Sequence, residues 1–169
     1  MTMRRPQRLI RVALSVLLLG AACTGAGGPQ HHGFGGGRTG VLAAGDMPVA
    51  AELVAGSTRP SDLVALWQSV LWADGYTALS SVTCTYDEAT VTATRVWQSN
   101  HHLDPDGIVG PATWGVAARR LVPAGRWTAY MGERHALALR LDAGGAYEVY
   151  DGGRFHRLRT NAVTLTRCR

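Results

Sequence analysis

The chain has 169 residues, 46% of them hydrophobic, which is enough for one ordinary domain or two small ones. Its formal charge of +5 comes from 17 arginines, with no lysine, against 12 acidic residues. Four of those arginines lie in the first 11 residues, so the rest of the chain is near +1 and its charge gives no reason to infer nucleic-acid binding.

Residues 1–26 have the pattern of a secretory signal peptide: basic residues, a short apolar run "VALSVLLLGAA", then small residues. The run is too short to span a bilayer comfortably. Cleavage before Cys23 would let that thiol carry a lipid, whereas cleavage after Ala26 would release a soluble protein, and both remain open. A twin-arginine signal at Arg4-Arg5 is the alternative export route.

Residues 27–56 begin with a glycine-rich stretch that has little to bury and reads as a flexible linker. His31 and His32 within it are interpreted as solvated linker residues rather than metal ligands. The piece "DMPVAAELVAG" at 46–56 is predicted to be a short flanking helix.

Residues 57–121 have helical periodicity and are predicted to form a three-helix domain. The first helix is capped by Ser61 or Asp62 and ends at "DG"; the second is capped by Asp87. The third opens at Pro111, a residue suited to the first turn of a helix.

An internal repeat joins these helices, because "LWQSVLWADGY" and "VWQSNHHLDPDG" share Trp-Gln-Ser thirty residues apart. A threonine, Thr90 or Thr113, then starts the next helix. The predicted product is a compact three-helix bundle. Its expected apolar centre comprises Leu66, Trp67, Val70, Leu71, Val96, Trp97, Ile108, Trp114 and Ala117.

From Gly125 the apolar residues alternate instead, as in "HALALRLD" and "AYEVYD" with glycine turns between. Residues 122–169 are therefore predicted to be a small antiparallel β module of three or four strands that packs on the helices. The predicted fold class is thus α+β. Cys84 and Cys168 are expected to form a disulfide between the first interhelical loop and the last strand, with two separate buried thiols as the alternative.

The acidic stretch "LDPDGIVGPATW" at 103–114 does not fit a calcium loop, since no third carboxylate precedes Gly107 and none follows it. Two aspartates in one turn are also unlike a glycosidase pair, whose members face each other from different elements. His101 and His102 point about 100° apart on a helix and do not readily share a metal. Nucleophile motifs such as Gly-x-Ser-x-Gly are missing. We expect no cofactor, no metal and no enzymatic activity.

Residues 59–121 resemble the type 1 peptidoglycan-binding domain of bacterial cell-wall hydrolases. The resemblance rests on the two Trp-Gln pairs, the Asp-Gly-Ile-Val-Gly turn and the Thr-Trp that opens the last helix. This chain has Asp87 where the family usually has glycine, and a longer loop around Cys84. The resemblance implies a non-catalytic three-helix fold that binds cell-wall glycan or stem peptide outside the cell.

The residues expected around a shallow polar groove for this ligand are Tyr76, Asn100, His101, Asp104 and Asp106, with Gly107 and Gly110 shaping the turn. The tryptophans of the repeat are expected in the core. The partner is expected to be peptidoglycan, with no nucleic acid, membrane contact only through a lipid at Cys23, and a monomeric chain.

Two alternatives remain open at this point. The helices could target a small cell-wall hydrolase, or the C-terminal module, with eight arginines and four acids, could bind an acidic wall polymer or a protein partner.

Overall fold

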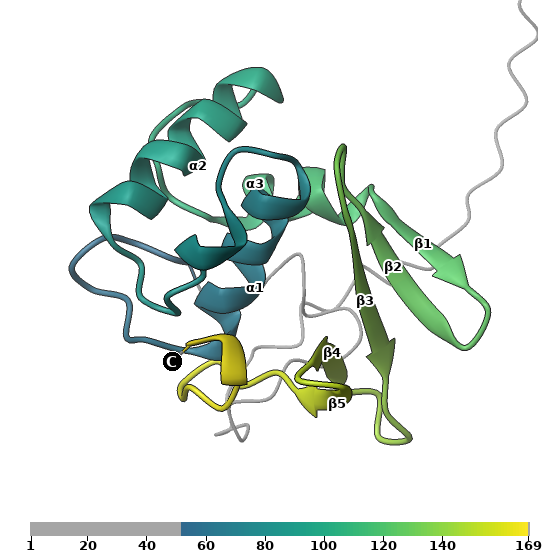
Figure 1. Ribbon diagram of the computed structural model, residues 1–169. Coiled ribbons are helices and arrows are strands. Elements are labelled where there is room, and N and C mark those ends of the chain that lie inside the picture. Colours follow the sequence, from purple (N-terminus) through teal and green to yellow (C-terminus); the bar gives the residue numbers. More distant parts are fainter. Residues whose placement is uncertain (1–51, 169) are drawn as a thin grey trace, which may run out of the picture. The chain divides into compact units, whose positions relative to one another are not determined.

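The computed structural model describes residues 52–168 and has an α+β fold, as the sequence predicts (Figure 1). The signal-peptide prediction, the Cys23 lipid site and linker residues 27–51 lie outside the described part. The helices are α1 (Asp62–Ala73), α2 (Glu88–Asn100) and α3 (Pro111–Ala118), with short 3-10 turns η2 (Leu79–Ser81) and η3 (Thr166–Cys168). The strands are β1 (Leu121–Ala124), β2 (Trp127–Met131), β3 (Ala136–Leu141), β4 (Tyr147–Asp151) and β5 (Arg154–Arg157).

The three helices begin at the residues that the sequence predicts. The Ser61 hydroxyl accepts a hydrogen bond from the Val64 amide, and the Asp87 carboxylate accepts one from the Thr90 amide. Pro111 stands in the first turn of α3 after Gly110. Helix α1 is buried along almost its whole length, including the polar side chains of Asp62, Gln68 and Ser69.

The sheet is an antiparallel meander in the order β1-β2-β3-β4-β5. The sequence predicts only three or four strands, because the segment "LVPAGRWTAYM", which forms the β1–β2 hairpin, lacks a clear alternation of apolar and polar residues. Pro123 and the small Ala124 obscure the alternation there, and a proline is tolerated because β1 is an edge strand. Alternate side chains Tyr130, Leu137, Leu139 and Val149 are buried.

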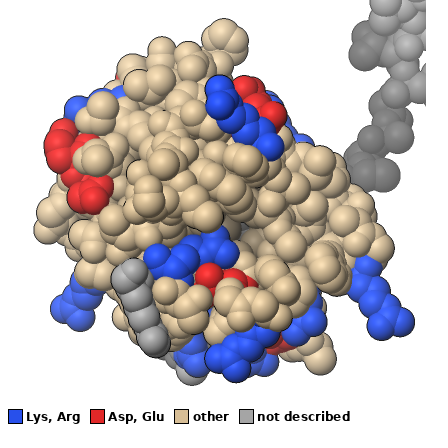
Figure 2. All heavy atoms as spheres, viewed as in Figure 1, with Lys and Arg blue, Asp and Glu red and all other residues tan. Residues whose placement is uncertain are grey.

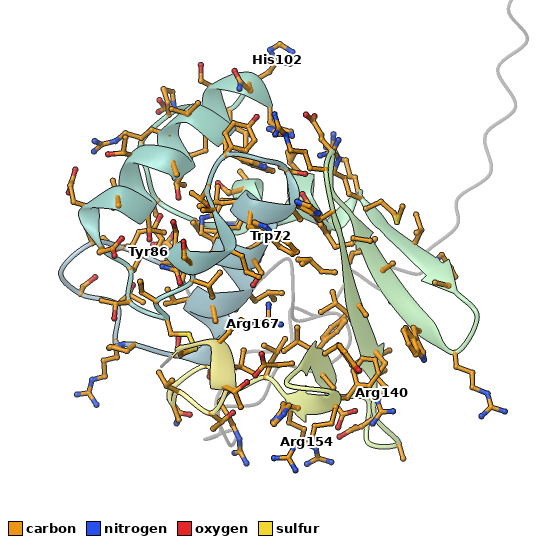
Figure 3. The ribbon with its side chains drawn as sticks, in the orientation of Figure 1. Trp72, Tyr86, His102, Arg140, Arg154 and Arg167 are labelled. Carbon is orange, nitrogen blue, oxygen red and sulfur yellow. A yellow bond between two sulfur atoms is a disulfide. The ribbon has the colours of Figure 1, made fainter. Side chains whose placement is uncertain are left out.

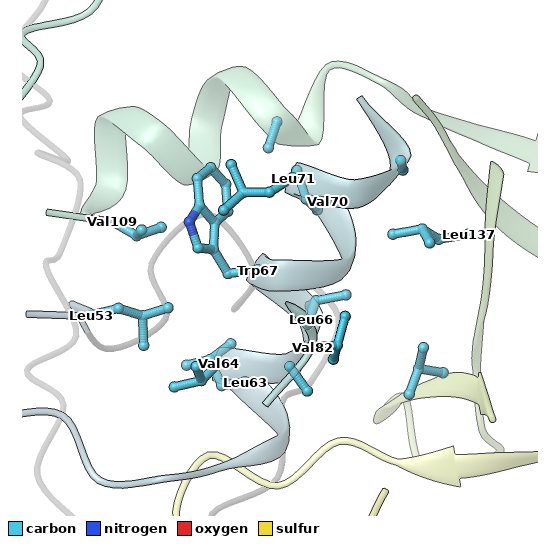
Figure 4. Close-up of a cluster of buried hydrophobic side chains, with 14 of the residues drawn as sticks. Leu53, Leu63, Val64, Leu66, Trp67, Val70, Leu71, Val82, Val109 and Leu137 are labelled. Atoms are coloured by element: carbon cyan, nitrogen blue, oxygen red, sulfur yellow. The ribbon is translucent and has the colours of Figure 1, made fainter. Parts of the chain in front are cut away.

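Helices and sheet share one hydrophobic core (Figure 4). Trp67 of α1 lies at its centre and packs edge-on against Trp97 and Trp114, with ring centroids 5.1 and 5.4 Å away. Leu66 and Val70 of α1 and Leu137 of β3 belong to the same cluster. The sheet is therefore not a separately packed module.

Two residues expected in the core are outside it. Val96 is 49% exposed, and Ile108 is only half-buried while its neighbour Val109 is fully buried. Val109 pairs with Leu53 in an isolated antiparallel bridge, and in extended backbone successive side chains point to opposite sides. The same bridge corrects the prediction of a flanking helix, because Leu53 is extended.

The disulfide between Cys84 and Cys168 is present, with Cα atoms 5.4 Å apart. The predicted location of its second cysteine is wrong: Cys168 lies in η3, because the chain after β5 runs back along α1 instead of forming another strand. Asp62 holds this returning segment. Its buried carboxylate accepts hydrogen bonds from the amides of Arg159, Thr164 and Leu165.

Candidate functional site

The glutamines of the Trp-Gln repeat have equivalent roles. The Gln68 side chain accepts from the Cys84 amide (2.8 Å) and donates to the Thr90 hydroxyl (2.8 Å). The Gln98 side chain accepts from the Gly107 amide (2.9 Å) and donates to the Thr113 hydroxyl (3.1 Å). Each glutamine therefore joins its helix to the following loop and to the threonine that starts the next helix, which makes both glutamines structural.

The tryptophans of the repeat are also structural. Trp67 donates its indole N–H to the Thr94 hydroxyl (2.8 Å), and Trp97 donates to the Asp74 carboxylate (2.7 Å). All three indole rings are buried, including Trp114. The side chains available to a ligand must therefore come from the surface of the bundle.

Two of the predicted site residues meet at the surface. Asn100, at the end of α2, donates a hydrogen bond from Nδ2 to the Tyr76 hydroxyl at 3.0 Å. These residues are 24 positions apart in the sequence, so their contact is a product of the fold. Figure 3 labels His102, which follows Asn100 by two positions at this end of α2.

Tyr76 lines a hollow of about 480 Å³ along α2, together with Thr77, Glu88, Ala89, Thr92, Ala93 and Val96. A second hollow of about 210 Å³ shares Thr77 and Ala89 and continues towards Thr83 and Asp87. We refer to these two adjoining hollows as the α2 groove. Its lining is mostly apolar, and its polar groups are hydroxyls, the carboxylates of Asp87 and Glu88, and the amide of Gln68.

Most of the α2 groove is not predicted from the sequence. A usable signal exists, since Ala89, Ala93, Val96 and Asn100 recur at intervals of three and four and so form one stripe of α2. This stripe differs from the buried one, which carries Trp97. The prediction that Val96 lies in the core is wrong. An apolar side chain on α2 can belong either to the buried stripe or to the groove stripe, and its apolar character does not distinguish the two.

The predicted aspartates lie elsewhere. Asp104, Asp106 and Gly110 line a hollow of about 270 Å³ that has no lining residue in common with the α2 groove. The Asp106 carboxylate accepts from the Ile108 amide (2.7 Å) and from Gln98 Nε2 (2.9 Å), so it closes the turn. Asp104 is exposed on the rim.

Gly107 and His101 support the turn from inside. Gly107 has φ +79°, and a Cβ there would lie 2.9 Å from Val91 Cγ1, so only glycine fits. The His101 ring stacks on Trp97, with centroids 3.9 Å apart, and donates from Nδ1 to the Trp97 carbonyl. The structure therefore does not bring the seven predicted residues together in a single groove.

Within residues 52–168, no group of three or more His, Cys, Asp or Glu side chains is arranged to hold a metal ion. In the same range, no helix is long and apolar enough to cross a membrane.

Comparison with known proteins identifies the helical part. Residues 60–116 match the family described as "Putative peptidoglycan binding domain", and this range contains α1, α2 and most of α3. No curated protein and no solved structure matches the chain. The resemblance predicted from the Trp-Gln repeat is confirmed: at residues 60–116 the chain carries a type 1 peptidoglycan-binding domain.

Proposed function

We propose that this protein binds bacterial peptidoglycan through the α2 groove, without catalysing a reaction, as a secreted or surface-anchored protein. The observation that carries the proposal is the Tyr76–Asn100 pair, placed at the groove of a domain that matches a peptidoglycan-binding family. The aromatic ring offers a surface on which a sugar can stack, and the amide and hydroxyl offer hydrogen bonds.

A buried polar atom in the groove supports the same proposal. Thr77 Oγ1 has no hydrogen-bond partner within the described residues, and Thr77 lines both hollows of the α2 groove. A buried hydroxyl without a partner is costly, so a rotation of the Thr77 side chain that exposes Oγ1 to the hollow would let a ligand hydroxyl or amide supply the missing hydrogen bond.

The hollow at the second turn is the second part of the proposed contact surface. Asp104 on its rim, with Asp106, Gly110 and the neighbouring His101, offers polar groups to hydroxyls and amides of the polymer. Asp104 is the residue to test, because Asp106 also closes the turn and its substitution would alter the fold.

The acidic-polymer alternative receives less support from the structure. Figure 2 shows basic side chains gathered over β4 and β5. However, Arg140 pairs with Glu148, Arg157 with Asp142, and Arg167 with Asp151. These ion pairs involve three of the seven arginines at 122–168, so they lower the long-range attraction of this surface for an anion without cancelling it.

A sedimentation assay with purified cell-wall sacculi tests the groove. We expect Tyr76→Ala and Asn100→Ala each to weaken retention by about tenfold, which corresponds to about 1.4 kcal/mol for a lost stacking or hydrogen-bonding contact. The matched controls are Trp127→Ala, an exposed aromatic on β2, and Asn161→Ala, an exposed asparagine in the C-terminal segment. If the folded groove variants are retained as well as the parent, the α2 groove is not the binding surface.

Two further measurements address the rest of the proposal. Zymography on cell-wall substrate should give no cleared band, and a cleared band would establish the hydrolase alternative.

Mass spectrometry of the mature protein should show cleavage within the first 26 residues, and a lipid mass on Cys23 would identify the anchor.

A further inference from the structure

Strands β3 and β4 separate at one end. They pair through only three residues each: Leu139 with Val149, Arg140 with Glu148, and Leu141 with Tyr147. The Ala136–Ala138 end of β3 and the Tyr150–Asp151 end of β4 do not pair with each other. Strand ends that do not pair with each other can pair with another extended chain through their main-chain groups, although the Tyr150 carbonyl already accepts a hydrogen bond from Arg167.

A cavity of about 310 Å³ lies at this separation. We refer to it as the strand cleft. The two strand ends line it together with Trp72 of α1, Leu79 of η2 and Arg167 of η3. Figure 3 shows Trp72 and Arg167 in the space between α1 and β3. The volume is at the small end of the range for ligand pockets, so the strand cleft admits only small side chains.

Arg167 is the cationic group of the strand cleft, and its position is fixed. It donates from Nε to Asp151 Oδ1 (2.9 Å), from Nη1 to Ser69 Oγ (3.2 Å) and from Nη2 to the Tyr150 carbonyl (2.7 Å). The adjacent Cys168 is tied to Cys84. A guanidinium has five N–H groups, and the hydrogen bonds among residues 52–168 use three of them. We assign the other two to the ligand.

We propose that the strand cleft binds the carboxyl end of a peptidoglycan stem peptide: a short extended peptide with small side chains and a free carboxylate. Arg167 is already paired with Asp151, so the ligand carboxylate would bind through the remaining N–H groups, as a second carboxylate on the same guanidinium, because arginine forms strong charge-assisted hydrogen bonds with carboxylates. The small side chains would contact Trp72 and Leu79, and the peptide backbone would pair with the separated strand ends. The choice of a wall peptide rests on the proposed function, whereas the choice of peptide chemistry rests on the strand cleft itself.

The test is isothermal titration calorimetry of the full chain with acetylated Lys-D-Ala-D-Ala, in the free-acid form and in the C-terminal amide form. We expect saturable binding of the acid and at least tenfold weaker binding of the amide, because the amide cannot pair with Arg167 as an anion. Ala136→Leu, which fills the strand cleft from an exposed position, should weaken binding of the acid at least tenfold. Ala124→Leu, an exposed alanine on β1, is the matched control and should bind as the parent does.

Equal affinity for acid and amide, or an unchanged affinity in Ala136→Leu, would overturn the proposal, as would a parent that binds neither peptide at millimolar concentration. Sacculi sedimentation is run in parallel on the same preparations. Retention on sacculi without tripeptide binding contradicts the strand cleft and leaves the proposed function standing. Tripeptide binding without retention on sacculi would support the strand cleft and contradict the proposed function.

Discussion

Asp74, in the turn after α1, connects several elements of the fold through its carboxylate. The sequence predicts only that it ends the first helix, yet its carboxylate is buried and accepts four hydrogen bonds. The donors are Trp97 Nε1, the Tyr130 hydroxyl, Arg120 Nη1 and the Glu133 amide. Asp74 therefore links α1 to α2 and to the sheet, and the sequence separations of 23 to 59 residues explain why no local pattern predicts this.

Replacing Asp74 with alanine should lower the free energy of unfolding by about 3 kcal/mol or more, because all four donors would lose their common hydrogen-bond acceptor at once. Urea unfolding measures this change. The control is Asp104→Ala, an exposed aspartate whose replacement should change the free energy by no more than about 0.5 kcal/mol. Similar losses in the two variants would show that Asp74 does not link the elements.

Deprotonation of Tyr86 should make the folded protein less stable at alkaline pH. Burial raises its pKa to about 12, and its hydroxyl donates to the Gly107 carbonyl at 2.7 Å. The unfolded chain loses this proton near pH ~10, so the stabilising contribution is complete below that pH and is lost as the pH rises towards 12. Between about pH 9 and pH 11, the parent should therefore lose more stability than Tyr86→Phe, measured as the shift in urea midpoint. Equal shifts in the two proteins would exclude Tyr86 as a cause.

At the scale of elements, the second turn depends on Gly107. An alanine there would adopt a left-handed backbone, costing about 1 to 2 kcal/mol, and its Cβ would also meet Val91. Gly125, in the β1–β2 hairpin, has φ +68° but no atom within 4 Å of the position that an alanine Cβ would take, so Gly125→Ala has only the backbone cost. Thermal unfolding should thus show Gly107→Ala to be less stable than Gly125→Ala by about 1 kcal/mol or more. If the two variants unfold alike, crowding at Val91 is absent.

Local patterns predict the helices well and the sheet less completely. The caps at Ser61, Asp87 and Pro111 act on neighbouring amides or on the local backbone, so the sequence reveals the start of each helix. The β1–β2 hairpin depends on pairing with the rest of the sheet, which "LVPA" does not signal. The candidate site is predicted in part: Tyr76 borders the α2 groove, whereas Asp106 turns inward to Gln98.

At the scale of the whole molecule, the helices and the sheet stabilise each other. Asp62 and Asp74, at the two ends of α1, have hydrogen-bond partners in the C-terminal half of the chain. The core cluster also continues from Leu66 to Leu137. The family match ends at residue 116, so the sheet is an addition to the matched domain that completes the burial of α1.

The disulfide should be the strongest single tie between these halves. It joins residues 84 positions apart, and in the chain-entropy model a loop of that length contributes about 4 to 5 kcal/mol. The double variant Cys84→Ala, Cys168→Ala should therefore have a much lower urea midpoint than the parent. Reductant should lower the midpoint of the parent and leave that of the double variant unchanged, which separates the bond from the effect of the substitutions. Because Cys168 follows Arg167, the same variant should also weaken the tripeptide binding proposed for the strand cleft more than the retention on sacculi.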